Sequence, residues 1–298
     1  MNLLKHKTYY LIFSFILMIP GIVFIAKDGL KLGIDFTGGS VSTYKVSTAN
    51  EKDLEEAYTK QQVDVLGINK TGNTITIRTK PIDTTKNASI VKDLKEKDSK
   101  LEVSSFETIG PTVGGETTKK AFMSVLISSF AIMLYIAYSF KNIPASYSSL
   151  RFGISAIIAM LHDAFIVVGS FAILGHYLKV EIDALFITAL LTVIGFSVHD
   201  TIVVFDRIRE NLNKLPKTLS FAEVANYSLV ETLNRSLTTS LTVIITLSSL
   251  FVLGGASIRY FVLALLVGIL SGTYSSLFTA TPILVIWESF AKSGKKKK

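Results

Sequence analysis

Six long apolar stretches constrain this chain more than any other feature of its sequence. A helix that crosses a bilayer needs roughly 20 predominantly apolar residues, and six stretches of the 298-residue chain approach or exceed that length. They cover residues 9–26, 121–140, 152–174, 184–205, 236–253 and 260–287. With 49% hydrophobic and only 18% charged residues, the composition also excludes an ordinary soluble domain. The sequence therefore predicts an α-helical membrane protein with six transmembrane helices.

The basic residues outside these stretches gather in every second loop. They concentrate at residues 5–7, 141–151, 207–217 and 292–298. Because loops rich in lysine and arginine stay in the cytoplasm, both termini are expected there. We expect the net charge of +8 to serve this topology and contact with anionic membrane lipid, not nucleic acid.

This topology predicts four parts. Residues 1–27 form a cytoplasmic N-terminus with the first transmembrane helix, and residues 28–119 form an extracytoplasmic domain. Residues 120–291 supply transmembrane helices two to six, and residues 292–298 form a basic cytoplasmic tail. The chain has no cysteine, so disulfides, thiolate metal sites and cysteine nucleophiles are excluded.

The extracytoplasmic domain alternates between strand and helix periodicity. Strands are predicted at 41–46, 62–68, 73–78 and 101–109, with one helix beginning at Asn50 and another at Asp83 or Thr84. The order βαββαβ indicates a small α+β, ferredoxin-like domain. It contains neither histidine nor cysteine, and its acids are interspersed with lysines, so we interpret them as a solvated surface and not as a catalytic site.

A glycine-rich segment, Gly33-Ile-Asp-Phe-Thr-Gly-Gly39, follows the first apolar stretch. Its glycines permit a tight chain reversal, and Asp35 can accept backbone hydrogen bonds. Without a following lysine and helix it is a weak phosphate-loop signal. We interpret it as a structural junction, with Glu107 to Gly114 as its counterpart where the chain leaves the domain.

Ionisable residues inside the apolar stretches are the strongest functional signal, because each costs a few kcal/mol unless it has a partner, water or a function. Asp200 lies six residues before Asp206, roughly 9 Å along a helix, which is too deep for a short carboxylate to reach the surface. Arg235 enters the next stretch from the same side, so it could pair with Asp200. Thr239 lies one turn beyond Arg235 and could hydrogen-bond either partner.

Such a pair could exchange protons, since burial favours the neutral acid and a nearby guanidinium favours the carboxylate. If helix movement alternately exposes Asp200 to Arg235 and to an outward-facing cavity, a proton binds on one side and leaves on the other. Each charge moved is worth about 2.3 kcal/mol per 100 mV of membrane potential. Proton coupling is therefore our hypothesis for this part of the chain.

Structural alternatives remain for each of these residues. Glu231 lies four residues before Arg235 and could clamp it at the membrane surface, which would leave Asp200 without that partner. His199 could be a proton relay, although a histidine hydrogen-bonded into helix packing is the more common case. His162 and Asp163 in the third stretch are likewise interpreted first as a hydrogen bond between spans and second as an accessory proton site.

The last apolar stretch carries a face of small residues. Gly268, Gly272 and Ser276 recur every four residues, so a neighbouring backbone could approach closely. That neighbour is expected either in this chain or in a partner.

Four segments form a set of motifs, which are Gly33–Gly39, Gly195–Asn211, Thr232–Ser236 and Ser271–Ser276. Together they resemble the SecF family, the smaller membrane subunits of the bacterial SecDF export complex. The resemblance implies a six-helix half of the resistance-nodulation-division fold in the bacterial cytoplasmic membrane, paired with a SecD subunit. It also implies use of the proton motive force to assist preproteins through the SecYEG channel, with YidC as a possible further partner.

The resemblance also assigns roles to residues. The proton-pathway aspartate of the family falls on Asp200, its arginine on Arg235 and an accompanying hydroxyl on Thr239, and the remaining essential carboxylate is expected on SecD. This chain departs from the family at His199, where asparagine is common, and at Phe196, where tyrosine is common. The resemblance implies no enzymatic activity and no cofactor.

Two other functions fit the same sequence. One is half of a small-molecule or lipid exporter of the same superfamily, although an extracytoplasmic domain of about 90 residues is small for a substrate funnel. The other is a passive scaffold that tethers other export components. No ATP-binding motif is present, so ATP hydrolysis would have to come from another protein.

Overall fold

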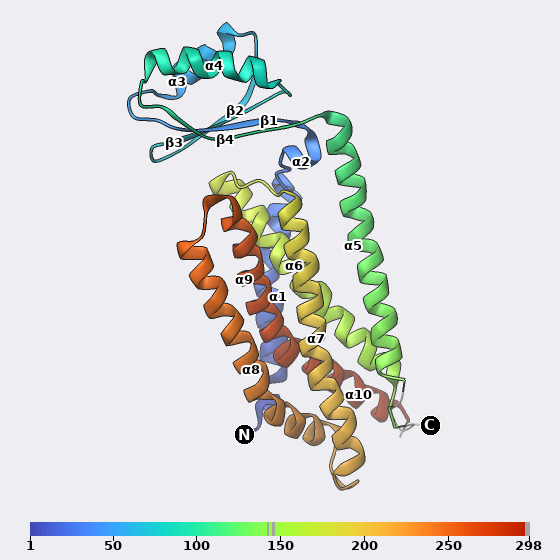
Figure 1. The fold of residues 1–298 in the computed structure, drawn as a ribbon. Coiled ribbons are helices and arrows are strands. Elements are labelled where there is room, and N and C mark those ends of the chain that lie inside the picture. Colours follow the sequence, from blue (N-terminus) through green and yellow to red (C-terminus); the bar gives the residue numbers. More distant parts are fainter. Residues whose placement is uncertain (142, 145–146, 296–298) are drawn as a thin grey trace. The chain divides into compact units, whose positions relative to one another are not determined.

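Long apolar helices account for most of the chain in the computed structural model, which describes residues 1–141, 143–144 and 147–295 (Figure 1). The chain divides into two units. We call Met1–Leu30, Ser124–Val180 and Leu185–Lys298 the helical unit, and Lys31–Met123 with Glu181–Ala184 the sheet unit.

Six helical runs among the described residues are long and apolar enough to cross a membrane, which confirms the predicted number. They are formed by η1 (Leu3–His6) with α1 (Lys7–Asp28), α5 (Pro111–Ser139), α6 (Ser149–Leu178), α7 (Ala184–Lys214), α8 (Phe221–Leu253), and η2 (Ala256–Ile258) with α9 (Arg259–Ser275), η3 (Ser276–Ala280) and α10 (Thr281–Lys295). Most extend beyond the apolar stretches, because amphipathic segments continue them. At the start of α8, for example, Ser220 and Glu223 form a capping box.

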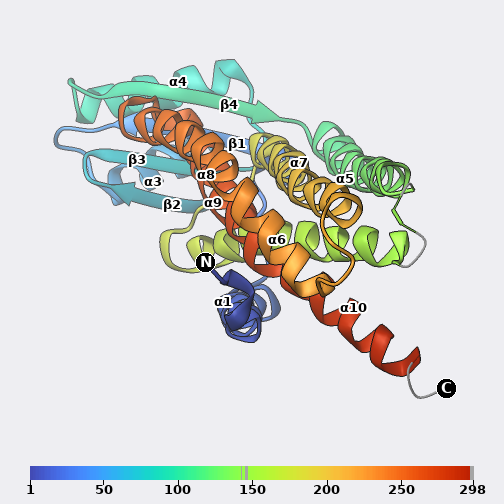
Figure 2. The same ribbon diagram turned by 90° about the horizontal axis from the view of Figure 1, so that it is seen from below.

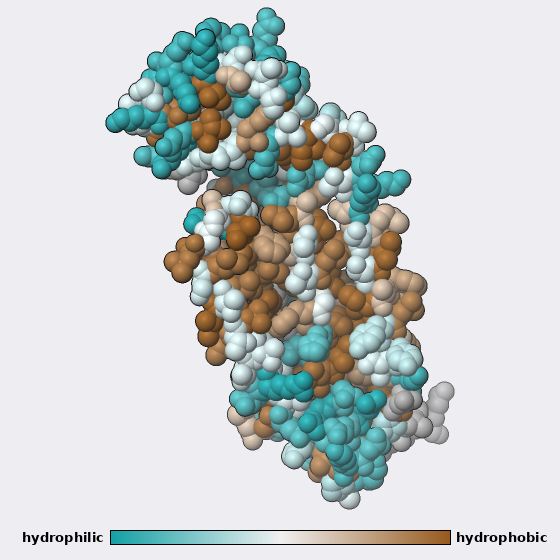
Figure 3. All heavy atoms as spheres, in the orientation of Figure 1, coloured by the Kyte–Doolittle hydropathy of each residue, from teal (hydrophilic) through white to brown (hydrophobic). Residues whose placement is uncertain are grey.

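The view along the helices shows how they pack (Figure 2). Helix α9 packs against α6 and α8, and α1 packs against α6. The N-terminus and the end of α10 lie at the same end of the helical unit. Hydrophobic side chains cover the sides of these helices, whereas hydrophilic ones gather on the sheet unit and around the loop between α7 and α8 (Figure 3).

The small face of α9 faces α7 of the same chain. A Cβ added to Gly268 would overlap Cγ2 of Val193, and one added to Gly272 would lie 3.3 Å from Cβ of Ser197. One turn further, Ser276 and Thr201 share a 3.0 Å hydrogen bond. The predicted close neighbour is confirmed, and it belongs to this chain.

The sheet unit contains a four-stranded antiparallel sheet in the described part of the chain, with strand order β2-β3-β1-β4. Its elements are α2 (Ile34–Thr37), β1 (Gly39–Lys45), α3 (Glu51–Lys60), β2 (Val65–Thr71), β3 (Thr74–Thr79), α4 (Thr84–Lys97) and β4 (Glu102–Ile109). Helices α3 and α4 cover one face of the sheet (Figure 1). Between them lies a core that includes the fully buried residues Tyr44, Leu54, Tyr58, Ile75, Ile77, Ile90 and Leu94.

The helix caps of this unit confirm the sequence prediction. The side chain of Asn50 accepts from the backbone of Lys52 and Asp53, and Asp83 accepts from the backbone of Lys86. The second strand was predicted from residue 62 but begins at Val65. The reason is that Gln62, which follows the C-cap of α3, is in a left-handed conformation with φ of 54°, so the chain needs two further residues before it is extended.

Candidate functional site

Asp200 lies on α7 and is 7% exposed. The hydroxyl of Ser236, on α8, donates a 2.7 Å hydrogen bond to Oδ1 of Asp200. The other oxygen, Oδ2, is buried and has no hydrogen-bond partner among the described residues. A buried carboxylate with one free acceptor oxygen has capacity left for a proton, a water molecule or a second donor.

The predicted ion pair between Asp200 and Arg235 is not formed. Arg235 is exposed on the helical unit, and within the described ranges it has no ion-pair partner within 4 Å. Successive residues of an α-helix are rotated by about 100°. Because Ser236 faces Asp200, its neighbour Arg235 turns to the side of α8.

Thr239 and His199 are also exposed. Thr239 lies one turn after Arg235 on α8, and its carbonyl accepts a 2.8 Å hydrogen bond from Thr242. His199 precedes Asp200 but faces outward, since adjacent helix positions point in different directions. The structure therefore does not bring Arg235, Thr239 or His199 into hydrogen-bond contact with Asp200.

Glu231 does not clamp Arg235 either. Its carboxylate accepts a 3.0 Å hydrogen bond from Asn211 and lies 3.5 Å from Nη1 of Arg207. Asn211 also donates to Ser228 at 3.0 Å. These residues fasten the end of α7 to the start of α8, which explains the Asp-Arg-Ile-Arg-Glu-Asn part of the motif at residues 206–211 structurally.

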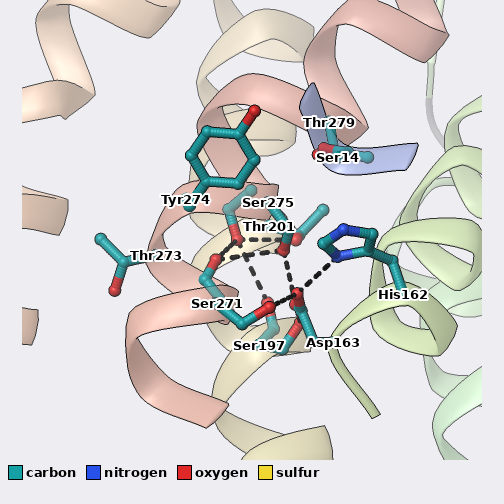
Figure 4. Close-up of polar contacts among 12 residues, drawn as sticks. Ser14, His162, Asp163, Ser197, Thr201, Ser271, Thr273, Tyr274, Ser275 and Thr279 are labelled. Carbon is teal, nitrogen blue, oxygen red and sulfur yellow. Dashed lines mark hydrogen bonds and ion pairs between the residues drawn. The ribbon is translucent and has the colours of Figure 1, made fainter. Parts of the chain in front are cut away.

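Asp163 is the centre of a second buried site (Figure 4). It is fully buried on α6, and it accepts hydrogen bonds from four side chains among those described. Ser271 donates at 2.7 Å, and Nδ1 of His162 lies 3.0 Å from Oδ1. Ser197 and Ser275 both donate to Oδ2. The cluster therefore confirms the hydrogen bond predicted between spans, and it joins α6, α7 and α9.

The two aspartates differ in how fully they are hydrogen-bonded. Four donors occupy the acceptor positions of the Asp163 carboxylate, so the cluster forms a closed set around it. Among the described residues, Asp200 has one donor and one oxygen without a partner. The geometry thus suits Asp163 for a fixed structural role and Asp200 for reversible binding of a proton, a water molecule or a second donor.

Further hydroxyl pairs join the last span to its neighbours. Thr273 points away from Asp163 and donates a 2.6 Å hydrogen bond to Ser240 of α8 (Figure 4). Ser14 of α1 and Thr279 share a 2.8 Å hydrogen bond. The second pair involves η3, a π-helical turn, and such turns are common at functional sites.

Comparison with known proteins identifies the family. Residues 89–289 match the family described as Protein export membrane protein SecD/SecF, C-terminal, and residues 23–49 match the SecD/SecF GG Motif. The chain belongs to the SecD/SecF family. The Protein translocase subunit SecF of Thermobaculum terrenum is 42% identical over 97% of this chain and 94% of that protein.

Longer members of the family contain a region like this chain. The Protein translocase subunit SecDF of Bacillus subtilis is 37% identical over 95% of this chain and 37% of its own length. The crystal structure of SecDF from Thermus thermophilus is 31% identical, with a TM-score of 0.84 over 97% of this chain. This chain spans 39% of that SecDF chain.

The GG motif of the SecD/SecF family has a clear geometric reason here. Gly38 and Gly39 have φ of 69° and 132°, which side-chain-bearing residues rarely adopt. A Cβ on Gly39 would also lie 2.8 Å from the carbonyl oxygen of Thr79. The motif therefore packs the chain tightly where it enters the sheet.

Sequence reasoning does not find two of the donors to the buried aspartates, Ser236 to Asp200 and Ser197 to Asp163. Both serines lie inside motif segments, Thr232–Ser236 and Gly195–Asn211, but the motifs alone do not indicate what the hydroxyls contact. The available signal was a small hydroxyl residue in an otherwise apolar helix, at a position that a neighbouring helix faces. That signal indicates contact only once the rotation of both helices is known.

Proposed function

We propose that this chain is a SecF-type subunit that works with a SecD-type subunit and uses the proton motive force to assist preprotein export. The observation that carries the proposal is the Asp200 carboxylate, which is buried in a membrane-spanning helix with one oxygen unpartnered in the described part of the chain. Proton binding and release at Asp200 is the step that couples the membrane potential to export.

Arg235 and Thr239 complete the proposed proton pathway, with His199 and Asp163 as accessory residues. The exposed Arg235 has no ion pair within the described ranges, although it stands at the start of the apolar part of α8. A guanidinium at that depth needs an acidic partner or water. A carboxylate on the SecD-type subunit supplies this partner, and small movements of α7 against α8 bring Asp200 and Arg235 together.

The remaining assignments follow from the same proposal. Both termini lie in the cytoplasm, and residues 28–119 form an extracytoplasmic domain of a multi-pass protein of the bacterial cytoplasmic membrane. The element order βαββαβ and the strand order β2-β3-β1-β4 support a ferredoxin-like domain. The SecYEG channel, YidC and unfolded preproteins are the further partners, and the chain performs no catalysis of its own.

The proposal is tested by the variants Asp200→Asn and Arg235→Met in cells that depend on this chain, with its natural partner present. We expect a sharp loss of export of a slowly exported reporter preprotein while co-purification with the SecD-type subunit stays normal. Asp206→Asn is the matched control, since Asp206 is an exposed carboxylate on the same helix and pairs with Arg209 at 2.6 Å. Unchanged export in both variants would mean that the chain acts only as a passive scaffold. A deletion strain with altered drug susceptibility and normal secretion would instead indicate a small-molecule exporter.

A further inference from the structure

The four residues Glu181–Ala184 lie between two membrane-spanning helices, yet they belong to the sheet unit. Ile182 forms a parallel bridge with Leu32. Its carbonyl accepts a 2.8 Å hydrogen bond from the backbone of Gly33, and its amide donates one of 2.8 Å to the carbonyl of Lys31. The backbone that leads into α7 is thus paired with the segment that leads into the sheet.

Asp35 holds the first residue of α7. Its Oδ2 accepts a 2.7 Å hydrogen bond from the backbone of Ala184, which begins this helix. The first amides of a helix lack partners within the helix, and a carboxylate near them also interacts favourably with the helix dipole. The prediction that Asp35 accepts backbone hydrogen bonds is confirmed, and its donor is the helix that carries Asp200.

Arg78 fixes the same segment from the sheet. It projects from β3, where Nη1 lies 2.7 Å from Oε1 of Glu181 and donates to the carbonyl of Leu32 at 3.2 Å. Its Nη2 donates a 2.6 Å hydrogen bond to the hydroxyl of Thr37. One guanidinium therefore contacts the segment before α7, the chain after α1 and the glycine-rich motif.

Gly33 permits this close packing. A Cβ at this position would lie 2.9 Å from the carbonyl oxygen of Ile182, which is closer than real Cβ contacts allow. Any other residue at position 33 would push the paired backbones apart. The glycine, the carboxylate of Asp35 and the guanidinium of Arg78 thus serve a single junction.

We propose that Asp35 and Arg78 are positioning residues that hold residues Glu181–Ala184, and so the first residue of α7, for the movement of α7 that accompanies proton binding at Asp200. Ala184 and Asp200 belong to the same continuous helix, so the held residue and the proton site share one element. The inference rests on the proposed function, because it assigns the transmission step between the proton site and the work of export.

The test uses charge reversal in the full chain with its partner subunit present. Arg78→Glu and Glu181→Arg are made singly and together, and export of a slow reporter is measured beside proton flux into membrane vesicles. Each single variant is expected to lower export roughly five- to tenfold with proton flux retained, and the double variant to restore export. The matched control reverses Lys80 and Asp64, which pair at the same 2.7 Å in the sheet unit without contacting residues 181–184. These control variants are expected to export normally.

Three outcomes would overturn the inference. They are normal export in the single variants, a double variant no better than either single one, and a loss of proton flux together with export. If a single charge-reversal variant does not accumulate, export and proton flux are measured in Glu181→Gln and in the double variant instead. Asp200→Asn separates this inference from the proposed function, because normal export in that variant contradicts the proton site itself. Loss of export in Asp200→Asn beside normal export in Arg78→Glu contradicts only the transmission step.

Discussion

The hydroxyl of Ser236 donates to Oδ1 of Asp200 across the α7–α8 contact, while Arg235, the preceding residue, faces away from that carboxylate. A rotation of α8 by about one residue step would exchange the two side chains, because adjacent helix positions differ by about 100°. Ser236 therefore holds Asp200 in the arrangement that lacks the arginine.

Ser236→Ala is expected to slow export about tenfold. The substitution removes the hydrogen bond that this chain supplies to the buried carboxylate, and hydrogen bonds to charged groups are worth about 1.5–3 kcal/mol. Export of a slow reporter preprotein measures the effect. Ser240→Ala is the control, since Ser240 lies one turn further on α8 and bonds Thr273 instead. Equal export in the two variants would contradict the role of Ser236.

Asp163→Asn is expected to destabilise the helical unit by ~3 kcal/mol, because an amide cannot accept from all four donors and leaves buried polar groups unpaired. The unfolding midpoint of the purified protein in a denaturant titration measures this effect. Asp200→Asn serves as the comparison, since Asp200 has a single donor among the described residues, and its midpoint should stay near that of the unchanged protein. A larger loss in Asp200→Asn than in Asp163→Asn would reverse our assignment of the two carboxylates.

The sequence was sufficient for the features that depend on local pattern. Apolar length predicted six spans, and alternating residues with the caps Asn50 and Asp83 predicted the elements of the sheet. The small face at Gly268 and Gly272 predicted a close helix contact. Each of these follows from spacing along one segment, which is what a sequence displays directly.

The contacts of the site depend on how each helix is rotated about its axis relative to its neighbour, which spacing along the sequence does not determine. Asp200 and Arg235 were placed at similar depth, yet a difference of one position on α8 puts Ser236, not Arg235, beside the carboxylate. Asp35 likewise has its donor 149 residues away, at Ala184. Contacts of this kind require the packing of helices that are distant in sequence.

The Asp98 carboxylate makes the stability of the sheet unit depend on pH. Its carboxylate accepts from the backbone amides of Ser47, Thr48, Ala49 and Lys100, and these hydrogen bonds lower its pKa to about 2. Because the pKa is near 3.9 in an unfolded chain, the stabilisation is complete above about pH 4 and is lost as the pH falls toward 2.

Hydrogen exchange at the amides of residues 47–49 measures this stabilisation in the full chain. We expect exchange, corrected for its intrinsic pH dependence, to accelerate between about pH 4 and pH 2. Asp98→Ala should exchange rapidly at these amides throughout and show no such transition. Asp93→Asn is the control, because Asp93 bonds the side chain of Gln61 and no backbone amide in the described region. A transition that persists in Asp98→Ala would assign it to another group.

Gly268→Ala is expected to destabilise the helical unit by about 1–3 kcal/mol, since overpacking a tight contact forces side chains or backbone to shift. The added methyl group would overlap Cγ1 and Cγ2 of Val193 on α7. Val193→Ala removes both of these atoms, so the double variant should be more stable than Gly268→Ala alone. A double-mutant cycle of unfolding midpoints measures this departure from additivity. Gly195→Ala is the control, because no atom of the described residues lies within 4 Å of a Cβ there, and a helix favours alanine over glycine. Additive effects of the two substitutions would mean that Gly268 does not face Val193 in the folded protein.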